Sequence, residues 1–329
     1  MTTATTTTPL RFDPLRIVRR IHPAYVALII LLIVVAFYNP NFLTPMGIMA
    51  FLRRSAALCI VSLGQMFVLV TGGFDLSVGS LITLTVMGSA LMINNDPTLT
   101  WSTIAIVYAI GIASGLFNGI VVSYLKVPSI IATLGALLSL KGIALAWSGG
   151  SPQGYLPDNF RMFGRVTLRD IPIIQVLPIS VIILVVVVAL CAWLFYGTTF
   201  GRLTLIIGDN PRAAELAGAR VRLVRITAFL VSALAAVTSG ILLGGFAGPA
   251  QDVGDGYDLQ AIAANVLGGT QLLGGKGSVA GVIAGSLTLT ALFTVLNLIG
   301  LPKPLRDAVQ GAILIAAVAY SMRRQRWGQ

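Results

Sequence analysis

Residues 206–218, with the sequence IIGDNPRAAELAG, interrupt two hydrophobic runs, Val176–Tyr196 and Ile226–Phe246. A helix needs roughly 20 apolar residues to cross a hydrocarbon core about 30 Å thick, and both runs have that length. The basic interruption as a whole extends from Gly197 to Arg225. The arrangement predicts a polytopic membrane protein with a helical segment outside the bilayer.

The centre of this interruption has the signals of a short capped helix. Asn210 is a favoured N-cap, Pro211 suits the first helical position, and Gly218 can adopt the left-handed conformation that ends a helix. The pattern predicts a helix from Pro211 to Ala217, roughly 10 Å long. Because so short a helix is marginal in water, we expect it to pack against another protein at the membrane face.

The composition of the chain is that of an integral membrane protein. Of the 329 residues, 56% are hydrophobic and 10% are charged, against about 45–50% and 25% in soluble domains. We expect an all-α fold with about ten transmembrane helices. The predicted spans are Ala24–Tyr38, Ala56–Thr71, Leu76–Ile93, Trp101–Val122, Ser129–Trp147, Val176–Tyr196, Ile226–Phe246, Tyr257–Leu267, Val279–Ile299 and Leu305–Tyr320.

The distribution of Lys and Arg predicts the orientation, because these residues are retained in cytoplasmic loops. With both termini inside, the inner segments hold 14 of the 22 basic residues, the outer segments hold seven, and Lys141 falls in a span. This favours an N-in, C-in topology. Residues 1–23 are then a cytoplasmic interfacial segment, residues 24–320 the membrane domain with the cytoplasmic loop 197–225, and residues 321–329 a cytoplasmic tail.

The charge and the reactive residues argue against several function classes. The net charge of +11 is explained by topology and by attraction to anionic membrane lipid, without nucleic acid. Cys59 and Cys191 both fall in predicted spans, so neither a disulfide nor a metal site is expected. His22 is the single histidine, and no catalytic set can be assembled around it. We therefore predict no catalytic residue and no metal in this chain.

A glycine-rich segment near residue 270 approaches the phosphate-binding P-loop pattern but fails it. Gly275 stands where the pattern needs Lys, and Gly277 follows Lys276 where Ser or Thr should bind magnesium. The chain is predicted to bind no cofactor, so any ATP and Mg²⁺ must sit on another chain.

Two glycine-rich interruptions, residues 71–80 and 268–278, lie at predicted membrane depth. Irregular backbone is tolerated there only where protein buries it or water reaches it. Both are candidates for the lining of a pathway, and a tight turn between two spans is the alternative for each. Asp75 in the first interruption is interpreted as a helix cap, with a role at the solute as the alternative. A faint likeness between the two segments is weak evidence for an internal repeat.

Three amide side chains, Gln65, Asn118 and Asn265, fall within predicted spans. They can hydrogen-bond the hydroxyl groups of a solute, or they can bond to neighbouring helices. Together with the first interruption they form the candidate translocation path: Gln65, Gly72, Gly73, Asp75, Asn118 and Asn265.

Three segments together resemble the permease subunits of ATP-binding cassette importers of the ribose/xylose/galactose type. They are residues 72–79 (GGFDLSVG), residues 207–218 (IGDNPRAAELAG) and residues 257–278, which contain YDLQAIAA and GGKGS. The likeness covers most of the chain, and the order and spacing of the segments are specific to this family. The sequence departs from the commoner family pattern at Asp209 and Ala219, and neither change breaks the predicted cap or helix.

The resemblance implies a type II importer permease that works with partner proteins. The partners are a second copy of the chain, a cytoplasmic ATP-binding subunit and a periplasmic or lipid-anchored solute-binding protein, in the bacterial inner membrane. The resemblance further implies that the short helix couples the permease to the ATPase. The coupling residues are then Asn210, Pro211, Arg212, Ala213, Ala214, Glu215, Leu216 and Gly218.

The resemblance also suggests where the solute-binding protein docks. Arg53, Arg54, Lys303 and Arg306 are expected in outer loops beside spans, where they can pair with acidic residues on the binding protein.

Two other function classes remain open from the residues. An ion-coupled secondary transporter would bury acidic residues in its spans, and the chain has few of these. A membrane enzyme or structural channel has no catalytic set to support it. The solute itself can be a pentose, a hexose, a polyol or a furanone signalling compound.

Overall fold

A computed structural model describes residues 23–171 and 175–302, and in the last segment residues 304–306, 308–309, 311–313, 315 and 319. The predicted interfacial segment before residue 23, the tail 321–329 and Lys303 lie outside the described residues. The last predicted span, Leu305–Tyr320, is described only in part.

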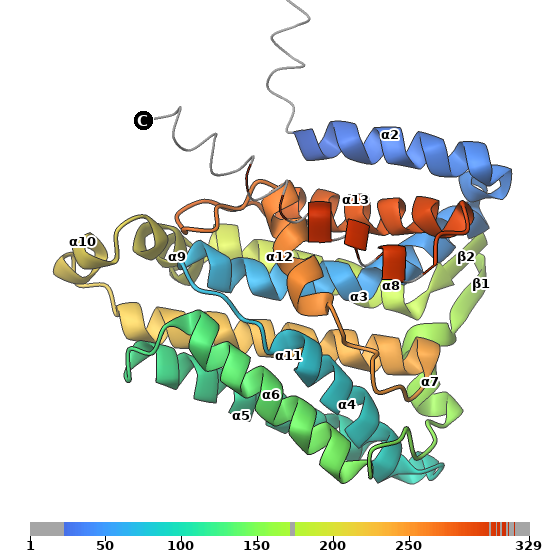
Figure 1. The fold of residues 1–329 in the computed structure, drawn as a ribbon, viewed down its shortest axis with the longest axis horizontal. Helices are drawn as coiled ribbons and strands as arrows, with labels where there is room; N and C mark the ends of the chain where they lie inside the picture. The colour runs from blue at the N-terminus through green and yellow to red at the C-terminus, as the bar shows by residue number, and fades with distance from the viewer. Residues whose placement is uncertain are drawn as a thin grey trace, which may run out of the picture.

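The described chain is a bundle of long apolar helices (Figure 1). In the described residues, six helices are long and apolar enough to cross a membrane: Pro45–Val70, Pro97–Ser123, Ser129–Trp147, Ile179–Gly197, Val221–Ala247 and Val279–Leu298. The shorter apolar helices Ala24–Tyr38 and Val78–Ile93 accompany them. The elements are α2 (Pro23–Tyr38), η1 (Pro40–Leu43), α3 (Pro45–Val70), α4 (Val78–Ile93), η2 (Pro97–Leu99), α5 (Thr100–Ser123), α6 (Ser129–Trp147), α7 (Asp158–Arg165), β1 (Thr167–Ile171), β2 (Gln175–Pro178), α8 (Ile179–Ala192), η3 (Trp193–Gly197), α9 (Thr199–Asp209), α10 (Pro211–Leu216), α11 (Val221–Ala247), α12 (Tyr257–Leu267) and α13 (Val279–Leu298).

The expectation of an all-α fold is wrong in one place. β1 and β2 form an antiparallel hairpin in which Leu168 pairs with Leu177. The span predicted from Val176 therefore begins as a strand, and α8 starts only at Ile179. A proline disfavours the helical conformation for the residue before it, so Leu177 stays extended before Pro178.

The second span also begins earlier than predicted. The Thr44 side chain accepts a hydrogen bond from the Gly47 amide, 3.1 Å away, and Pro45 occupies the first turn. This cap starts α3 at Pro45 rather than at Ala56. As a consequence Arg53 and Arg54 lie within a helix and not in a loop.

The core is built on α3 and α11, which run antiparallel. Gly64 of α3 faces Ser232 and Ala235 of α11, and Ser239 Oγ of α11 donates to the Ala57 carbonyl at 2.9 Å. Small side chains let the two backbones approach closely, which is how membrane helices gain packing energy.

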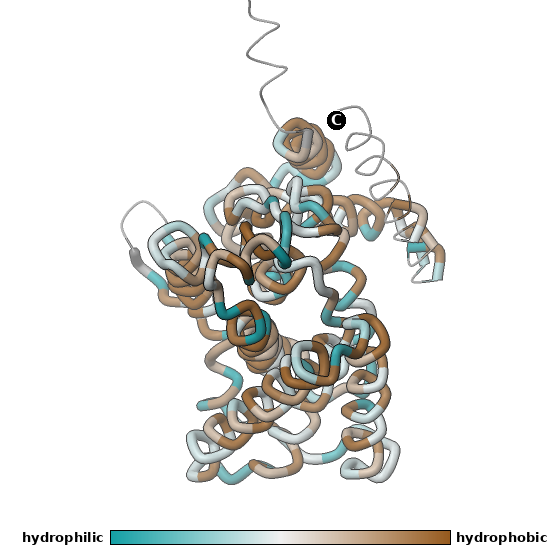
Figure 2. Tube along the Cα trace, turned by 90° about the vertical axis from the view of Figure 1, so that its left-hand side faces the viewer, coloured by the Kyte–Doolittle hydropathy of each residue, from teal (hydrophilic) through white to brown (hydrophobic). Residues whose placement is uncertain are grey.

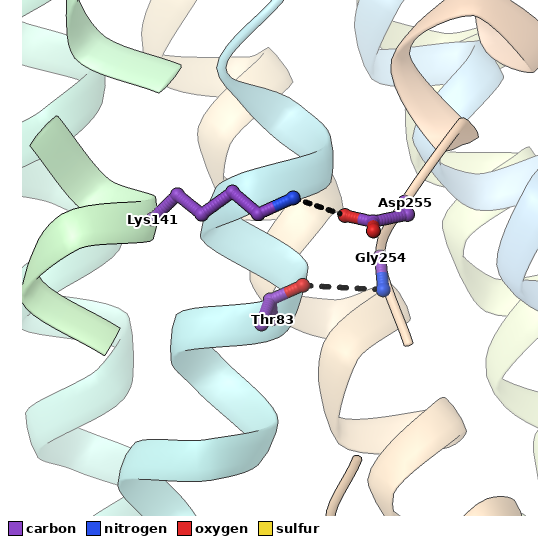
Figure 3. Close-up of polar contacts among 4 residues, drawn as sticks. All are labelled: Thr83, Lys141, Gly254 and Asp255. Carbon is purple, nitrogen blue, oxygen red and sulfur yellow. Dashed lines mark hydrogen bonds and ion pairs between the residues drawn. The ribbon is translucent and has the colours of Figure 1, made fainter. Parts of the chain in front are cut away.

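The segment that separates α11 from α12 packs on the first turns of α4. Residues 71–77 separate α3 from α4, and residues 248–256 separate α11 from α12. The Gly254 backbone packs directly on Gly79, and the Gly254 amide donates to Thr83 Oγ1 at 3.2 Å (Figure 3). The N-terminal turns of α4 and α12 are therefore neighbours.

The segment 248–256 reaches α4 through glycine. Gly254 can reach Gly79 because neither residue has a side chain to keep the backbones apart. The segment 268–278, by contrast, lies at the end of the bundle that carries α10, where the Gly275 amide donates to the Val70 carbonyl at 3.0 Å. There the first interruption packs on it, since the Gly72 backbone lies against Leu273 and Gly274.

Figure 2 looks along the bundle from the end that carries α10. Most of the helical trace is hydrophobic, and hydrophilic residues are frequent in the segments that connect the helices. This end holds the elements of the candidate site.

Candidate coupling and translocation site

The short helix α10 is present with the predicted caps. Asn210 Oδ1 accepts a hydrogen bond from the Ala213 amide at 3.0 Å. Gly218 ends the helix with φ +84°, and a Cβ atom placed on it would have no neighbouring atom within 4 Å. The helix spans Pro211–Leu216, one residue less than predicted. It is anchored by Ala214, which is buried with Ile207 and Val224. Its outward side presents Leu216, which is 81% exposed.

Most other residues of the segment 197–225 are helical and do not form an irregular loop. Thr198 caps α9 by accepting from the Gly201 amide at 3.2 Å, and α11 already begins at Val221. Near the end of α9, the Gly208 backbone packs against the Val70 carbonyl and Gly275. This contact joins the base of α10 to the end of α3, so α10 is not free to move alone.

A cavity of about 570 Å³ separates α10 from the first interruption. Gly72 and Gly73 line it on one side, and Arg212 and Glu215 of α10 line it on the other. Residues predicted for translocation and residues predicted for coupling therefore share one cavity. A second, mostly apolar groove of about 600 Å³ runs between α9, α10 and α11.

Asp75 is the centre of a buried hydrogen-bond network. The carboxylate is 1% exposed, and its Oδ1 accepts from the Ser77 amide at 3.1 Å and the Ser77 hydroxyl at 2.6 Å. Its Oδ2 accepts from Ser232 Oγ of α11 at 2.9 Å. Asp75 thus bonds to the first turn of α4, as the cap interpretation expects, and also ties that turn to α11.

The three predicted amides also take part in bonds between elements. With its Nε2 turned toward the Asp75 carbonyl, Gln65 of α3 pairs with both the carbonyl and the amide of Asp75 at 3.2 Å. Asn118 Nδ2 of α5 donates to Ser77 Oγ at 2.9 Å. Asn265 Nδ2 of α12 donates to the Ser62 carbonyl of α3 at 2.8 Å. Each amide is at most 1% exposed, so in this conformation the three hold helices together.

The structure therefore brings Gln65, Asp75 and Asn118 together and leaves Asn265 in a separate contact between α12 and α3. Sequence reasoning missed Ser77 and Ser232, which complete the Asp75 network. The spacing of Asp75 and Ser77 is typical of an Asx turn, so the sequence offered a signal for Ser77. It offered no signal for Ser232, which is distant in sequence.

Lys141 forms an ion pair that the sequence did not reveal. Its Nζ lies 3.0 Å from Asp255 Oδ1, and the two side chains are 40% and 51% exposed (Figure 3). Lys141 lies two-thirds of the way along the apolar helix α6. A half-exposed ion pair at that depth must face water or protein rather than lipid. It links α6 to the segment 248–256, beside the contact between Thr83 and Gly254.

We expect the two charges to be coupled in transport. Changing Lys141 to Gln or Asp255 to Asn should each lower solute uptake by about two- to fivefold, because the remaining charge loses its partner. In a double-mutant cycle the combined variant should lose little more than either single variant. Fully additive losses would contradict the coupling.

The residues predicted to dock a binding protein are only partly where the sequence placed them. Arg53 is inside α3 with its guanidinium 5.2 Å from the ring centre of Phe246, whereas Arg54 is exposed on the same helix. Arg306 Nη1 donates to Asn297 Oδ1 at 3.0 Å, and Lys303 lies outside the described residues. Arg53 therefore has a packing role that a loop residue would lack.

Comparisons with known proteins identify the family of the chain. The model of the family described as "Branched-chain amino acid transport system / permease component" matches residues 47–318. The chain belongs to this permease family. The match contains both interruptions, the Asp75 network and α10.

Several bacterial relatives align with most of the chain. The ribose import permease protein of Bacillus subtilis (strain 168) is 33% identical over 306 residues, which cover 91% of this chain and 92% of that protein. The autoinducer 2 import system permease protein of Klebsiella pneumoniae (strain ATCC 700721 / MGH 78578) is 34% identical, over 91% of this chain and 86% of its own. That of Escherichia coli (strain K12 / DH10B) is 32% identical with the same coverage. No solved structure matches the chain. The protein is thus a multi-pass membrane permease related to import permeases.

Proposed function

We propose that this chain is the membrane-spanning permease subunit of an ATP-driven importer for a simple sugar or sugar-like solute, delivered by a binding protein. The observation that carries the proposal is α10, a capped helix with exposed Leu216 at the end of a bundle that belongs to a permease family. The relatives named as import permeases for ribose and autoinducer 2 support the solute class.

We further propose ten membrane crossings with both termini in the cytoplasm. Residues 71–77 precede the short helix α4, and residues 248–256 precede the short helix α12. Each helix therefore completes a crossing together with the segment before it. The end that carries α10 also carries Lys126 and Arg222, in keeping with retention of positive charge on the inside. Residues 1–23 and 321–329 are then cytoplasmic, residues 24–320 form the membrane domain, and the segment 197–225 faces the ATPase.

The proposed assembly lies in the bacterial inner membrane, in contact with lipid. It contains two copies of this chain, an ATP-binding subunit that holds ATP and Mg²⁺, and a solute-binding protein. In this assembly the permease itself binds no cofactor or metal, contacts no nucleic acid and has no catalytic residue.

The contacts support a mechanical route from the ATPase to the path. Closure of the ATPase on ATP displaces α10, and the Gly208 contact transmits the displacement to the end of α3 and to residues 71–77. Because Asp75 ties this segment to α4 and α11, the inner end of the path changes shape with α10. Such coupling requires that the two states of the permease bind the ATPase differently. Direct contact of Gln65, Asn118 or Asn265 with solute stays a prediction.

Uptake by the reconstituted system tests the proposal. Proteoliposomes with the permease, the ATPase and the binding protein should accumulate solute on addition of ATP, and omission of either partner should abolish accumulation. Full uptake driven by an ion gradient alone would instead establish the ion-coupled transporter.

The docking proposal now rests on Arg54 more than on Arg53. We expect Arg54→Glu to weaken binding of the solute-binding protein, with a loss that shrinks as salt is raised, because exposed charges act through a screened field. Arg169→Glu, on β1, is the control for a general change of charge. If the Arg54→Glu variant binds the solute-binding protein at low salt as tightly as the unmodified chain does, the docking site is rejected.

A further inference from the structure

The cavity of about 570 Å³ beside α10 has a cationic lining whose chemistry the transport proposal does not use. Lys126, Arg212, Arg222 and Arg225 line it, and Glu215 is the one acidic residue on its wall. Among the described residues, the ion pair that the structure contains is Lys141–Asp255, so none of these four cations has a carboxylate partner. Among the described residues of the cavity wall, four cations therefore face one carboxylate, which leaves a local excess of positive charge.

A buried hydroxyl group adds a hydrogen-bonding group to the same cavity. Ser123, at the end of α5, is only 6% exposed, and its Oγ has no hydrogen-bond partner. The residue is one of those that line the cavity. A buried hydroxyl without a partner costs free energy unless a ligand or water completes its bonding.

Two helices also begin at the cavity wall. The first turns of α6 and α11 contribute Ser129 and Val221 to the lining, and neither helix has a side-chain cap at its N-terminus. Uncapped first turns leave backbone amides available and carry partial positive charge. Arg222, the second residue of α11, is held over the Tyr124 ring with its guanidinium carbon 5.1 Å from the ring centre.

We propose that this cavity is a binding site for a phosphate group. A phosphate group carries at least one full negative charge and several acceptor oxygens, and Arg guanidinium groups match it in bidentate geometry. A carboxylate has only two oxygens and would leave most of the four cations without a bond. The site goes beyond the proposed transport function, because it lies beside the helix that meets the ATPase and not on the solute. A bound phosphate would join α10, through Arg212, to α11, through Arg225.

The phosphate can belong to an anionic lipid headgroup or to a soluble phosphate ester, and two binding measurements separate these sources. The full-length permease is placed in phosphatidylcholine nanodiscs and titrated calorimetrically with glycerol 3-phosphate, with glycerol as the neutral control. In parallel, the permease is exchanged into detergent micelles that contain phosphatidylglycerol and phosphatidylcholine, and retained lipid is counted by native mass spectrometry.

The expected result is saturable binding with one site per chain in at least one measurement. Arg225→Gln should weaken it about tenfold or more, since a charge-assisted bond is worth about 1.5–3 kcal/mol. Ser123→Ala should weaken it less. Arg202→Gln on α9 is the matched control, since it removes the same charge outside the cavity lining, and it should leave affinity unchanged. Lys126→Gln, an exposed substitution, replaces Arg225→Gln if that variant does not fold.

Binding of glycerol 3-phosphate alone assigns the soluble ester, and retention of phosphatidylglycerol alone assigns the lipid headgroup. Absence of saturable binding in both measurements overturns the site, as does an equal loss in Arg202→Gln. ATP-dependent uptake is scored separately on the unmodified chain, so failure of this site and failure of the transport proposal remain distinguishable.

Discussion

Replacing Asn210 by Ala together with Gly218 by Val is expected to lower ATP-dependent uptake at least about tenfold while the membrane bundle stays folded. The Asn210 cap is worth about 1 kcal/mol, and a β-branched residue at φ +84° is strained by a further 1–2 kcal/mol or so. A helix of six residues has no reserve against such losses. Because Ala214 is the one buried residue of α10, the long helices should keep their stability. The measurement is uptake and ATP hydrolysis by the reconstituted system, with thermal unfolding of the permease.

The matched control is Asn210→Ser, which keeps a hydroxyl that can accept the Ala213 amide and should retain uptake. A second variant, with Glu215 and Gly218 replaced together, tests the register at the surface of α10. If hydrolysis and uptake stay coupled and the complex still assembles in both double variants, α10 is not the coupling helix.

Replacing Asp75 by Ala is expected to have the largest effect on stability. The substitution removes both carboxylate oxygens from a site that is 1% exposed, so Ser77 and Ser232 lose their acceptors. Loss of a buried charged partner of this kind costs about 3 kcal/mol. Thermal unfolding in detergent should begin several degrees lower, and uptake should fall because α4 loses its connection to α11.

Asp96 provides the matched control, because it makes the same local motif at the surface. Its Oδ1 accepts from the Thr98 amide at 2.9 Å and the Thr98 hydroxyl at 2.7 Å. These bonds, the hydroxyl bond first, lower the pKa of the exposed Asp96 carboxyl. Asp96→Ala should leave the unfolding temperature nearly unchanged, since water satisfies the freed groups. Equal effects of the two substitutions would show that the long-range bond to Ser232 contributes nothing.

Local signals explain which parts of the fold were predictable. The caps of α10 lie within a few residues of the helix they end, so Asn210, Pro211 and Gly218 were sufficient to place it. The apolar runs likewise placed most spans, because the length of a span is set by the bilayer. Errors arose where a local signal was overlooked, as with the Thr44 cap that starts α3 eleven residues before Ala56, and the strand before Pro178.

Contacts between distant segments were beyond the reach of such signals. The approach of Gly254 to Gly79, the bond from Ser232 to Asp75 and the pair formed by Lys141 and Asp255 each join residues more than 100 positions apart. An Asp or a Lys in a span indicates that a partner is needed, but many polar residues can supply it. The partner is chosen by how α3, α4, α6 and α11 pack.

The sequence by itself determined that this is a helical membrane protein with a capped polar helix between two spans, because hydrophobic length and helix capping are local properties. The permease function followed from the resemblance of three segments to a known family. The tertiary structure alone decided that α10, Gly72–Gly73 and the cations Arg212, Arg222 and Arg225, which have no carboxylate partner among the described residues, line one cavity. The physical reason is that packing between helices, which depends on small residues at contacts such as Gly208 with Val70 and Gly275, sets distances that no single segment encodes.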